Sequence, residues 1–152
     1  MNITIRKAVE AEIDILLGFE QGVVDAERPF TTTLKDGTIH YYDIIDLIKS
    51  DKAEVLVAVS DNEIIGSGYA KIMEAKPYRK FKEFAYLGFM YVKPEYRGKG
   101  INKMIIDSLI EWAKSRDLTE VQLDVYDENT SAKKAYEKVG FKPHLLEMRM
   151  EI

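Results

Sequence analysis

Two hydrophobic periods follow one another along the chain and predict an alternation of strands and helices. Alternating or continuous short apolar runs predict strands, and they lie at residues 3–8, in a hairpin over 54–74, and at 83–92, 120–126 and 145–152. Apolar residues spaced three and four apart predict helices, and they lie near 9–23, 39–50, 101–115 and 129–139. Because a hairpin interrupts the alternation, we expect one domain over residues 1–152 of mixed α/β (α+β) class, with a sheet covered by helices.

Local signals mark several ends of these elements. Asp61 and Asn62 tolerate the positive φ of a tight turn and predict the bend of the hairpin. Asn129 or Thr130 can cap the last helix, and Gly140 suits its left-handed stop. The strand at 83–92 is apolar on both faces, which predicts a central position in the sheet.

Composition narrows the class of protein. The 152 residues include no Cys, and the two His are far apart in the sequence, so we expect no metal site. The net charge of −4 disfavours nucleic acid as a partner. No apolar run approaches the length of about 18 residues that a membrane span needs, and the first residues do not resemble a signal peptide. We therefore expect a cytoplasmic protein that contacts no membrane.

The stretch "RGKGIN", Arg97 to Asn102, lies between a predicted strand and a predicted helix. The first amides of a helix lack internal partners and point outward at the positive end of its dipole, so they bind anions. Glycines let the backbone curl around a phosphate, and nearby lysines add charge. The pattern matches neither a Walker A loop nor a dinucleotide fingerprint. Taken alone, it also fits a glycine turn with solvated lysines.

A second stretch, "NTSAKKAYEKVGF" from Asn129 to Phe141, makes the resemblance specific. With "RGKGIN" before it, the chain resembles the GNAT superfamily of N-acetyltransferases. The first motif of that superfamily is Arg/Gln-x-x-Gly-x-Gly/Ala, and the second is Asn-x-x-Ala-x-x-x-Tyr-x-x-x-Gly-Phe. Asn102 departs from the small residue that usually ends the first motif, and its effect on CoA binding stays open.

The resemblance implies a fold and a co-substrate. The implied fold is a central mixed, mostly antiparallel sheet of six to seven strands, with about four helices on both faces. The implied co-substrate is acetyl-CoA, bound without a metal. Its pyrophosphate would take the amides of the first motif, its pantetheine arm would pair with the fourth strand, and Asn129 would bond the arm from the other side. The implied cofactor-binding residues are Met90, Tyr91, Val92, Arg97, Gly98, Lys99, Gly100, Ile101, Asn102, Lys103, Asn129 and Lys133.

The implied reaction is acetyl transfer to a primary amine. The resemblance assigns the oxyanion to the amide of Met90 and the general acid to Tyr136. Gly88 fits a bulge that would free the Met90 amide, and it fits a plain packing glycine equally well. For the base we favour Asp124, because the ribosomal-protein N-terminal acetyltransferases have a carboxylate at the matching position. Asp124 is one methylene shorter than a Glu at that position, so it would act through a bridging water. Tyr86 and Glu83 are the alternatives, and many members of the family have no single base.

The sequence says less about the amine acceptor and about binding partners. Asp25 and Glu27 would attract a cationic amine, whereas the basic loop "KPYRKFK", residues 76–82, would attract an acidic one. A protein N-terminus, a polyamine, an aminoglycoside and an amino acid all stay open. The competing functions are a CoA-binding module without turnover and, less favoured, nucleic-acid binding through the basic loop. A homodimer through the strand at 145–152 is a further possibility that the resemblance raises.

Overall fold

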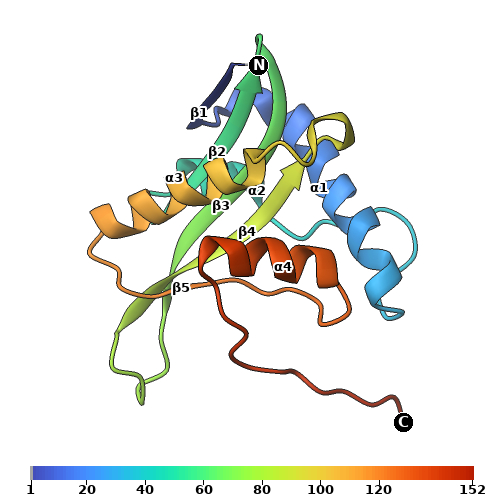
Figure 1. Ribbon diagram of the computed structural model, residues 1–152, viewed down its shortest axis with the longest axis vertical. Helices are drawn as coiled ribbons and strands as arrows, with labels where there is room; N and C mark the ends of the chain where they lie inside the picture. Colours follow the sequence, from blue (N-terminus) through green and yellow to red (C-terminus); the bar gives the residue numbers. More distant parts are fainter. Residues whose placement is uncertain (1) are drawn as a thin grey trace.

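A single five-stranded sheet forms the centre of the protein, in a computed structural model that describes residues 2–152 (Figure 1). Its strands follow the chain in the order β1-β2-β3-β4-β5. The first four pair antiparallel, and β5 runs parallel to β4. The strands are β1 (Ile3–Lys7), β2 (Ala53–Ser60), β3 (Glu63–Glu74), β4 (Glu83–Val92) and β5 (Val121–Gln122).

Four α-helices cover both faces of this sheet, as predicted (Figure 1). Apolar side chains of α1 and α2 pack with one face, and those of α3 and the end of α4 pack with the other. The helices are α1 (Ile13–Glu27), α2 (Ile44–Lys49), α3 (Ile101–Ser115) and α4 (Thr130–Val139), and short 3₁₀ turns lie at Glu10–Glu12, Arg28–Phe30 and Pro94–Tyr96.

The predicted hairpin and the last two helices are confirmed. Asp61 and Asn62 have φ of 48° and 67° and form the turn between β2 and β3. Helix α3 covers the predicted residues 101–115. Asn129 caps α4 by accepting a hydrogen bond from the amide of Ala132, and Gly140 ends it at φ 123°.

The first two helices differ from their predicted bounds. Helix α1 begins four residues later than predicted and continues to Glu27 before the turn that contains Pro29. Helix α2 is much shorter than the predicted 39–50. The helix begins after Asp43, which has non-helical dihedrals (φ −94°, ψ 87°) and caps it by accepting a hydrogen bond from the amide of Asp46. The amides of Tyr41 and Tyr42, before the helix, donate instead to the buried carboxylate of Glu20, at 2.8 and 2.9 Å.

The C-terminal half of the sheet is also smaller than predicted. Strand β5 covers two residues of the predicted 120–126, because β4 and β5 pair only at Ala85–Val121 and Tyr86–Gln122. The strand predicted at 145–152 does not form, and this segment leaves the body of the molecule in an extended path (Figure 1). The prediction of six to seven strands was therefore too high, because this segment pairs with no strand within residues 2–152.

Candidate active site

A row of outward-facing backbone amides lies where β4 leads into α3. Within residues 2–152 the amides from Gly98 to Lys103 donate to no other backbone group, and the first helical bond runs from Met104 to the carbonyl of Gly100, at 3.2 Å. Gly98 and Gly100 have φ of 75° and 78°, a conformation that L side chains rarely adopt. The resulting curled backbone at a helix N-terminus has the form of an anion site.

The row begins one residue later than predicted. The amide of Arg97 donates to the carbonyl of Pro94 at 3.2 Å, so it is not free for a phosphate. Its side chain is engaged as well, because Nε donates to the carbonyl oxygen of Val92 at 2.8 Å and the guanidinium lies 5.6 Å from the ring centre of Tyr91. Arg97 therefore holds the end of β4 against the loop.

The other cations of the loop are exposed. Lys103 forms an ion pair with Asp107 one turn along α3, at 2.7 Å, and the ammonium of Lys99 lies 5.6 Å from the ring centre of Tyr96. Both ammonium groups are at the surface, where an arriving anion can reorient them. Asn102, in the first turn of α3, is half-buried.

The loop is fastened at its start by Glu63, the first residue of β3. Its carboxylate accepts hydrogen bonds from Lys93 Nζ at 2.8 Å and from the Tyr96 hydroxyl at 3.0 Å. These contacts tie the turn before the free amides to the sheet, so the row of amides is held by the body of the protein.

A β-bulge interrupts β4 close to this loop. Ser67 pairs with Tyr91, but Tyr69, two residues along β3, pairs with Gly88, three residues back along β4. Strand β4 therefore carries an extra residue in this interval. The bulge lies between Gly88 and Tyr91, whereas Gly88 itself pairs with Tyr69, whose ring leaves no room for a Cβ at that position.

The bulge turns one peptide bond toward the open side of β4. Phe89 has a φ of 58°, an unfavourable conformation for a bulky residue, and its carbonyl accepts a hydrogen bond from the Ser67 hydroxyl of β3 at 3.0 Å. In a trans peptide the carbonyl and the following N–H point in opposite directions. The amide of Met90 therefore points away from β3, toward the side on which β4 and β5 diverge.

Helix α4 carries two of the predicted cofactor-binding residues. Asn129 uses its carbonyl oxygen to cap α4, at 3.2 Å from the amide of Ala132, and its NH₂ group makes no hydrogen bond within the described residues. Lys133 is bonded to Asp127 at 3.0 Å and is half-buried. The structure thus gives both residues a local role in shaping the start of α4.

Tyr136 lies on the same helix and is half-buried. Its ring packs edge-on against Phe141, with 6.1 Å between centroids. Burial raises the pKa of the Tyr136 phenol, and the carboxylate of Glu27 raises it further.

Asp124 is brought beside Tyr86. Its Oδ2 accepts a hydrogen bond from the Tyr86 hydroxyl at 2.9 Å, and its own side chain is exposed. Burial and this hydrogen bond raise the pKa of Tyr86, and burial with the charge of Asp124 raises the pKa of Tyr69 to about 12. Both phenols are therefore neutral at physiological pH. Glu83, which the sequence analysis named with Tyr86 as an alternative base, is exposed at the far end of β4.

Glu27, the last residue of α1, acts electrostatically on several tyrosines. It is half-buried, and burial raises its pKa. Its charge raises the pKa of five phenols from four parts of the chain, namely Tyr41, Tyr42, Tyr86, Tyr126 and Tyr136. Asp25, paired with Glu27 in the sequence analysis, is exposed.

Sequence reasoning missed Tyr41, Tyr42, Tyr69 and Tyr126. Tyr42 lies edge-on to Tyr69, with 5.4 Å between centroids, and Lys71 Nζ lies 5.8 Å from the ring centres of both Tyr69 and Tyr86. The one available signal was the abundance of tyrosine, 9 in 152 residues. That count does not say which of them the fold brings together.

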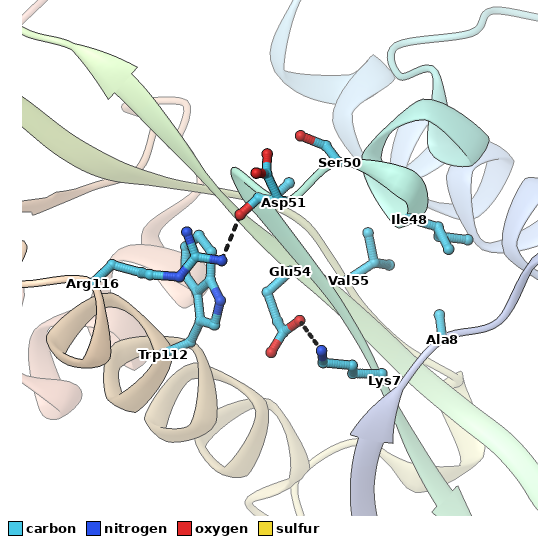
Figure 2. Close-up of a pocket in the computed structure, with 10 residues that line it drawn as sticks. Lys7, Ala8, Ile48, Ser50, Asp51, Glu54, Val55, Trp112 and Arg116 are labelled. Atoms are coloured by element: carbon cyan, nitrogen blue, oxygen red, sulfur yellow. Dashed lines mark hydrogen bonds and ion pairs between the residues drawn. The ribbon is translucent and has the colours of Figure 1, made fainter.

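A separate hollow of about 220 Å³ lies between β1, β2, α2 and α3 (Figure 2). Lys7 pairs there with Glu54 at 3.5 Å, and Arg116 lies over the ring of Trp112, 5.1 Å from its centre. None of the predicted site residues lines it. Its two cations are therefore already engaged by neighbouring side chains.

No helix within residues 2–152 combines the length and the apolar character needed to cross a membrane. No group of three or more His, Asp or Glu side chains in the same range is arranged to hold a metal ion.

The mixed sheet covered by helices on both faces, with the outward-facing amide row at the start of α3, agrees with the fold that the family resemblance implied. The model of the Acetyltransferase (GNAT) family matches residues 21–141. The chain belongs to that family.

Several curated relatives share shorter regions with the chain. A thialysine N-epsilon-acetyltransferase of Bos taurus is 42% identical over 55 residues, 36% of this chain and 32% of its own length. A glucosamine 6-phosphate N-acetyltransferase of Trypanosoma brucei brucei is 30% identical over 89 residues, 59% of this chain and 58% of its own. An aminoglycoside N(6')-acetyltransferase of Salmonella typhimurium is 24% identical over 109 residues, 67% of this chain and 71% of its own. The chain spans between 23% and 40% of the length of the first relatives it matches.

Solved structures share the fold over the whole chain. A mutant of the BH1408 protein from Bacillus halodurans has a TM-score of 0.86 at 22% identity, covering 98% of this chain and 99% of its own. A predicted acetyltransferase from Clostridium acetobutylicum, solved with acetyl-CoA, has a TM-score of 0.70 at 22% identity, covering 97% and 96%.

Proposed function

We propose that this protein is an N-acetyltransferase that transfers the acetyl group of acetyl-CoA directly to a cationic primary amine. The observation that carries the proposal is the position of the free amides of Gly98–Lys103 beside the bulge that aims the Met90 amide toward the gap between β4 and β5. A diphosphate and a thioester carbonyl joined by one flexible arm fit these two backbone sites.

The co-substrate is held mainly by the backbone. Amides of Gly98, Gly100 and the first turn of α3 donate to the pyrophosphate, and Lys99 and Lys103 add positive charge. The pantetheine arm lies along Met90 to Val92, where β4 has no β5 partner. The free NH₂ group of Asn129 donates to the arm from the α4 side.

The acetyl carbonyl accepts a hydrogen bond from the amide of Met90. When the lone pair of the amine attacks the carbonyl carbon, this amide stabilises the negative charge that develops on oxygen. The bond between Ser67 and Phe89 sets the amide direction before the substrate arrives, so no reorganisation is needed during the reaction. A preorganised donor of this kind is typically worth about 10²–10³ in rate.

The amine arrives as an ammonium and has to lose a proton. A lysine-like amine has a pKa of about 10.4, so deprotonation at pH 7 costs roughly 4–5 kcal/mol. Asp124 takes this proton through a water molecule, and the Tyr86 hydroxyl holds its carboxylate in place at 2.9 Å. A carboxylate oriented by a buried phenol has fewer positions to sample than a free one.

Tyr136 gives its phenolic proton to the leaving thiolate of CoA. Burial raises the pKa of this phenol above its ordinary value of about 10, while a thiol has a pKa of about 8.5 in water. The transfer is therefore uphill, by about 2 kcal/mol or more before the site acts on the thiolate. The same burial disfavours the charged thiolate. This raises the pKa of the thiol and narrows the difference from the pKa of the Tyr136 phenol.

Glu27 selects the class of acceptor. A half-buried carboxylate among neutral phenols attracts an ammonium group, and the ring faces provide additional cation–π attraction. The basic side chains of residues 76–82 follow β3 and precede β4, so they lie roughly 23 Å along the strand from Met90. Their exposed charges are therefore less suited to orient the amine than Glu27.

The experiment is a thiol-release assay over a panel of primary amines with Tyr136→Phe as the paired variant. We expect thiol release with cationic amines, and about a 10²–10⁴-fold lower kcat in the variant with unchanged CoA affinity. Calorimetric binding of CoA with no thiol release from any amine would instead indicate a CoA-binding module without turnover.

A further inference from the structure

Lys71, on β3, is a half-buried cation without an anionic partner. Three lysines within residues 2–152 are half-buried. Lys93 pairs with Glu63 at 2.8 Å, and Lys133 pairs with Asp127 at 3.0 Å. Lys71 forms no ion pair with any residue of the same range. Withdrawing an ammonium group from water is costly when no anion compensates for it, so this charge calls for a function.

The nearest groups to the Lys71 ammonium are two phenol rings. Its Nζ lies 5.8 Å from the ring centre of Tyr69 and 5.8 Å from that of Tyr86. Burial and the charge of Asp124 raise the pKa of Tyr69 to about 12, and burial raises the pKa of Tyr86 as well. Neither phenol is therefore ionised at physiological pH. The ring faces attract the ammonium group but do not neutralise its charge.

The same phenol links Lys71 to the proposed catalytic base. Lys71 lies directly opposite Tyr86 in the ladder between β3 and β4, and the Tyr86 hydroxyl donates to Asp124 at 2.9 Å. Tyr69 and Tyr86 pack with the apolar cluster under α1 and α2. Lys71 follows Tyr69 by two residues, so its side chain is on that face too. An ammonium and a carboxylate thus lie beside one phenol without pairing with each other.

We propose that Lys71 is a specificity-determining residue that binds a carboxylate group of the amine acceptor. The inference rests on the proposed function, because it requires the acceptor amine to reach Asp124. The acceptor is then a zwitterion, with its ammonium group on the side of the acidic residues and its carboxylate accepting hydrogen bonds from Lys71 Nζ. A single ammonium suits a carboxylate, whereas a phosphate is usually held by several donors.

The position of Lys71 along the sheet limits the length of this acceptor. Its partner Tyr86 precedes Met90 by four residues, which is roughly 13 Å along the strand. The Lys71 side chain covers part of that distance. The reacting amine and the carboxylate are therefore separated by several bonds, as in an ω-amino acid.

The basic loop at residues 76–82 is the competing site for an acidic acceptor. Its end at β4 lies roughly 23 Å along the strand from Met90, and its lysines and arginine are exposed. Exposed charges are screened by salt and contribute little to a single contact. Lys71 is nearer to the proposed reaction centre and less screened, so we place the carboxylate there.

Two probes of equal shape, 6-aminohexanoate and its carboxamide 6-aminohexanamide, test the proposal. Calorimetric titration of each probe in excess CoA gives its dissociation constant, and the thiol-release assay with acetyl-CoA gives kcat/KM. We expect the wild type to prefer the carboxylate at least about tenfold in both measurements. Lys71→Gln should lower this ratio to about one. Lys71→Arg should retain most of it, because a guanidinium also donates to a carboxylate.

Lys82→Gln, in the exposed basic loop, is the control and should keep the preference. A wild type that treats the two probes alike would overturn the proposal, as would a preference that survives in Lys71→Gln or disappears in Lys82→Gln. The ratio compares two probes in one protein, so a partly unfolded variant does not imitate the expected result. If no amine releases thiol, the proposed function fails, and the calorimetric ratio still decides the role of Lys71.

Discussion

The hydroxyl of Ser67 on β3 donates a 3.0 Å hydrogen bond to the carbonyl oxygen of Phe89 in the bulge of β4. Both residues are buried, and Phe89 is held at a φ of 58°. The bond offsets part of the cost of that conformation and determines which way the next amide points. A serine one strand away from the proposed reaction centre thereby sets its geometry.

Removing this hydroxyl should lower turnover without removing the amide itself. We expect Ser67→Ala to reduce kcat by less than about 10²-fold with CoA affinity retained, because the Met90 amide is present but less well held. The unpaired carbonyl should also cost about 1–3 kcal/mol of stability. Steady-state kinetics and chemical denaturation measure the two effects. Ser60→Ala, at another buried serine, is the control for stability; equal kcat values in all three proteins would contradict the role of Ser67.

A negative side chain in the amide row should prevent CoA from binding. Gly100→Glu places a carboxylate beside the pyrophosphate position and forces a side chain into a left-handed conformation. Calorimetric titration with CoA should then show no binding. Gly37→Glu is a matched control, since Gly37 has a φ of 82° and equally open surroundings in a different loop. Tight binding by the Gly100 variant would exclude the row as the pyrophosphate site.

Variants of Asp124 and Tyr86 distinguish a catalytic base at Asp124 from a carboxylate with a structural role only. Asp124→Asn retains a hydrogen-bond acceptor for Tyr86 but loses the charge, and we expect kcat to fall about 10²-fold or more. Tyr86→Phe retains the Asp124 carboxylate but removes the hydroxyl that holds it in place, and we expect a smaller loss of kcat. The ratio of the two effects on kcat is the measurement, and a larger loss from Tyr86→Phe would show that Asp124 serves only to position the phenol.

Glu27 should show a trade-off between activity and stability. Burial raises its pKa, so its ionised form costs stability at neutral pH. We expect Glu27→Gln to raise the Tm at pH 7 while raising the KM for cationic amines. The Tm difference should vanish as the pH falls below the unfolded-state pKa of about 4.3, because Glu27 is then protonated in both the folded and the unfolded state.

The exposed neighbour Asp25 provides the control for this change. Asp25→Asn should leave both the Tm and the KM unchanged at pH 7. If the two variants behave alike, the position of Glu27 among the tyrosines has no bearing on the acceptor.

Glu20 should be the carboxylate on which the loop before α2 depends. It is fully buried and accepts hydrogen bonds from two backbone amides and from His40 Nδ1 at 2.8 Å. Glu20→Ala leaves these donors without partners and should destabilise the protein by at least about 3 kcal/mol. Denaturant titration measures the loss, and a change below 1 kcal/mol, about the value of an ordinary exposed contact, would contradict it.

Elements with complete local signals were predictable, and elements that depend on partners were not. Helix α3 has its bounds set by Gly100 at one end and by a continuous apolar stripe, so the periodicity located it. Helix α2 was overestimated because the residues before Asp43 are held in a loop, where Tyr41 donates to the carboxylate of Glu20, 21 positions earlier. The strand at 145–152 was predicted from alternation, which reports a preference for extended structure but says nothing of an available partner.

The sequence by itself determined the alternation of elements, the curled amide row and the family, because glycine conformation, helix termini and hydrophobic period are local properties. Tertiary structure alone decided which phenols feel the charge of Glu27 and that Ser67 directs the peptide after Phe89. These relations join residues that are far apart in the sequence. They arise only when packing brings separate elements together, and no local pattern encodes that distance.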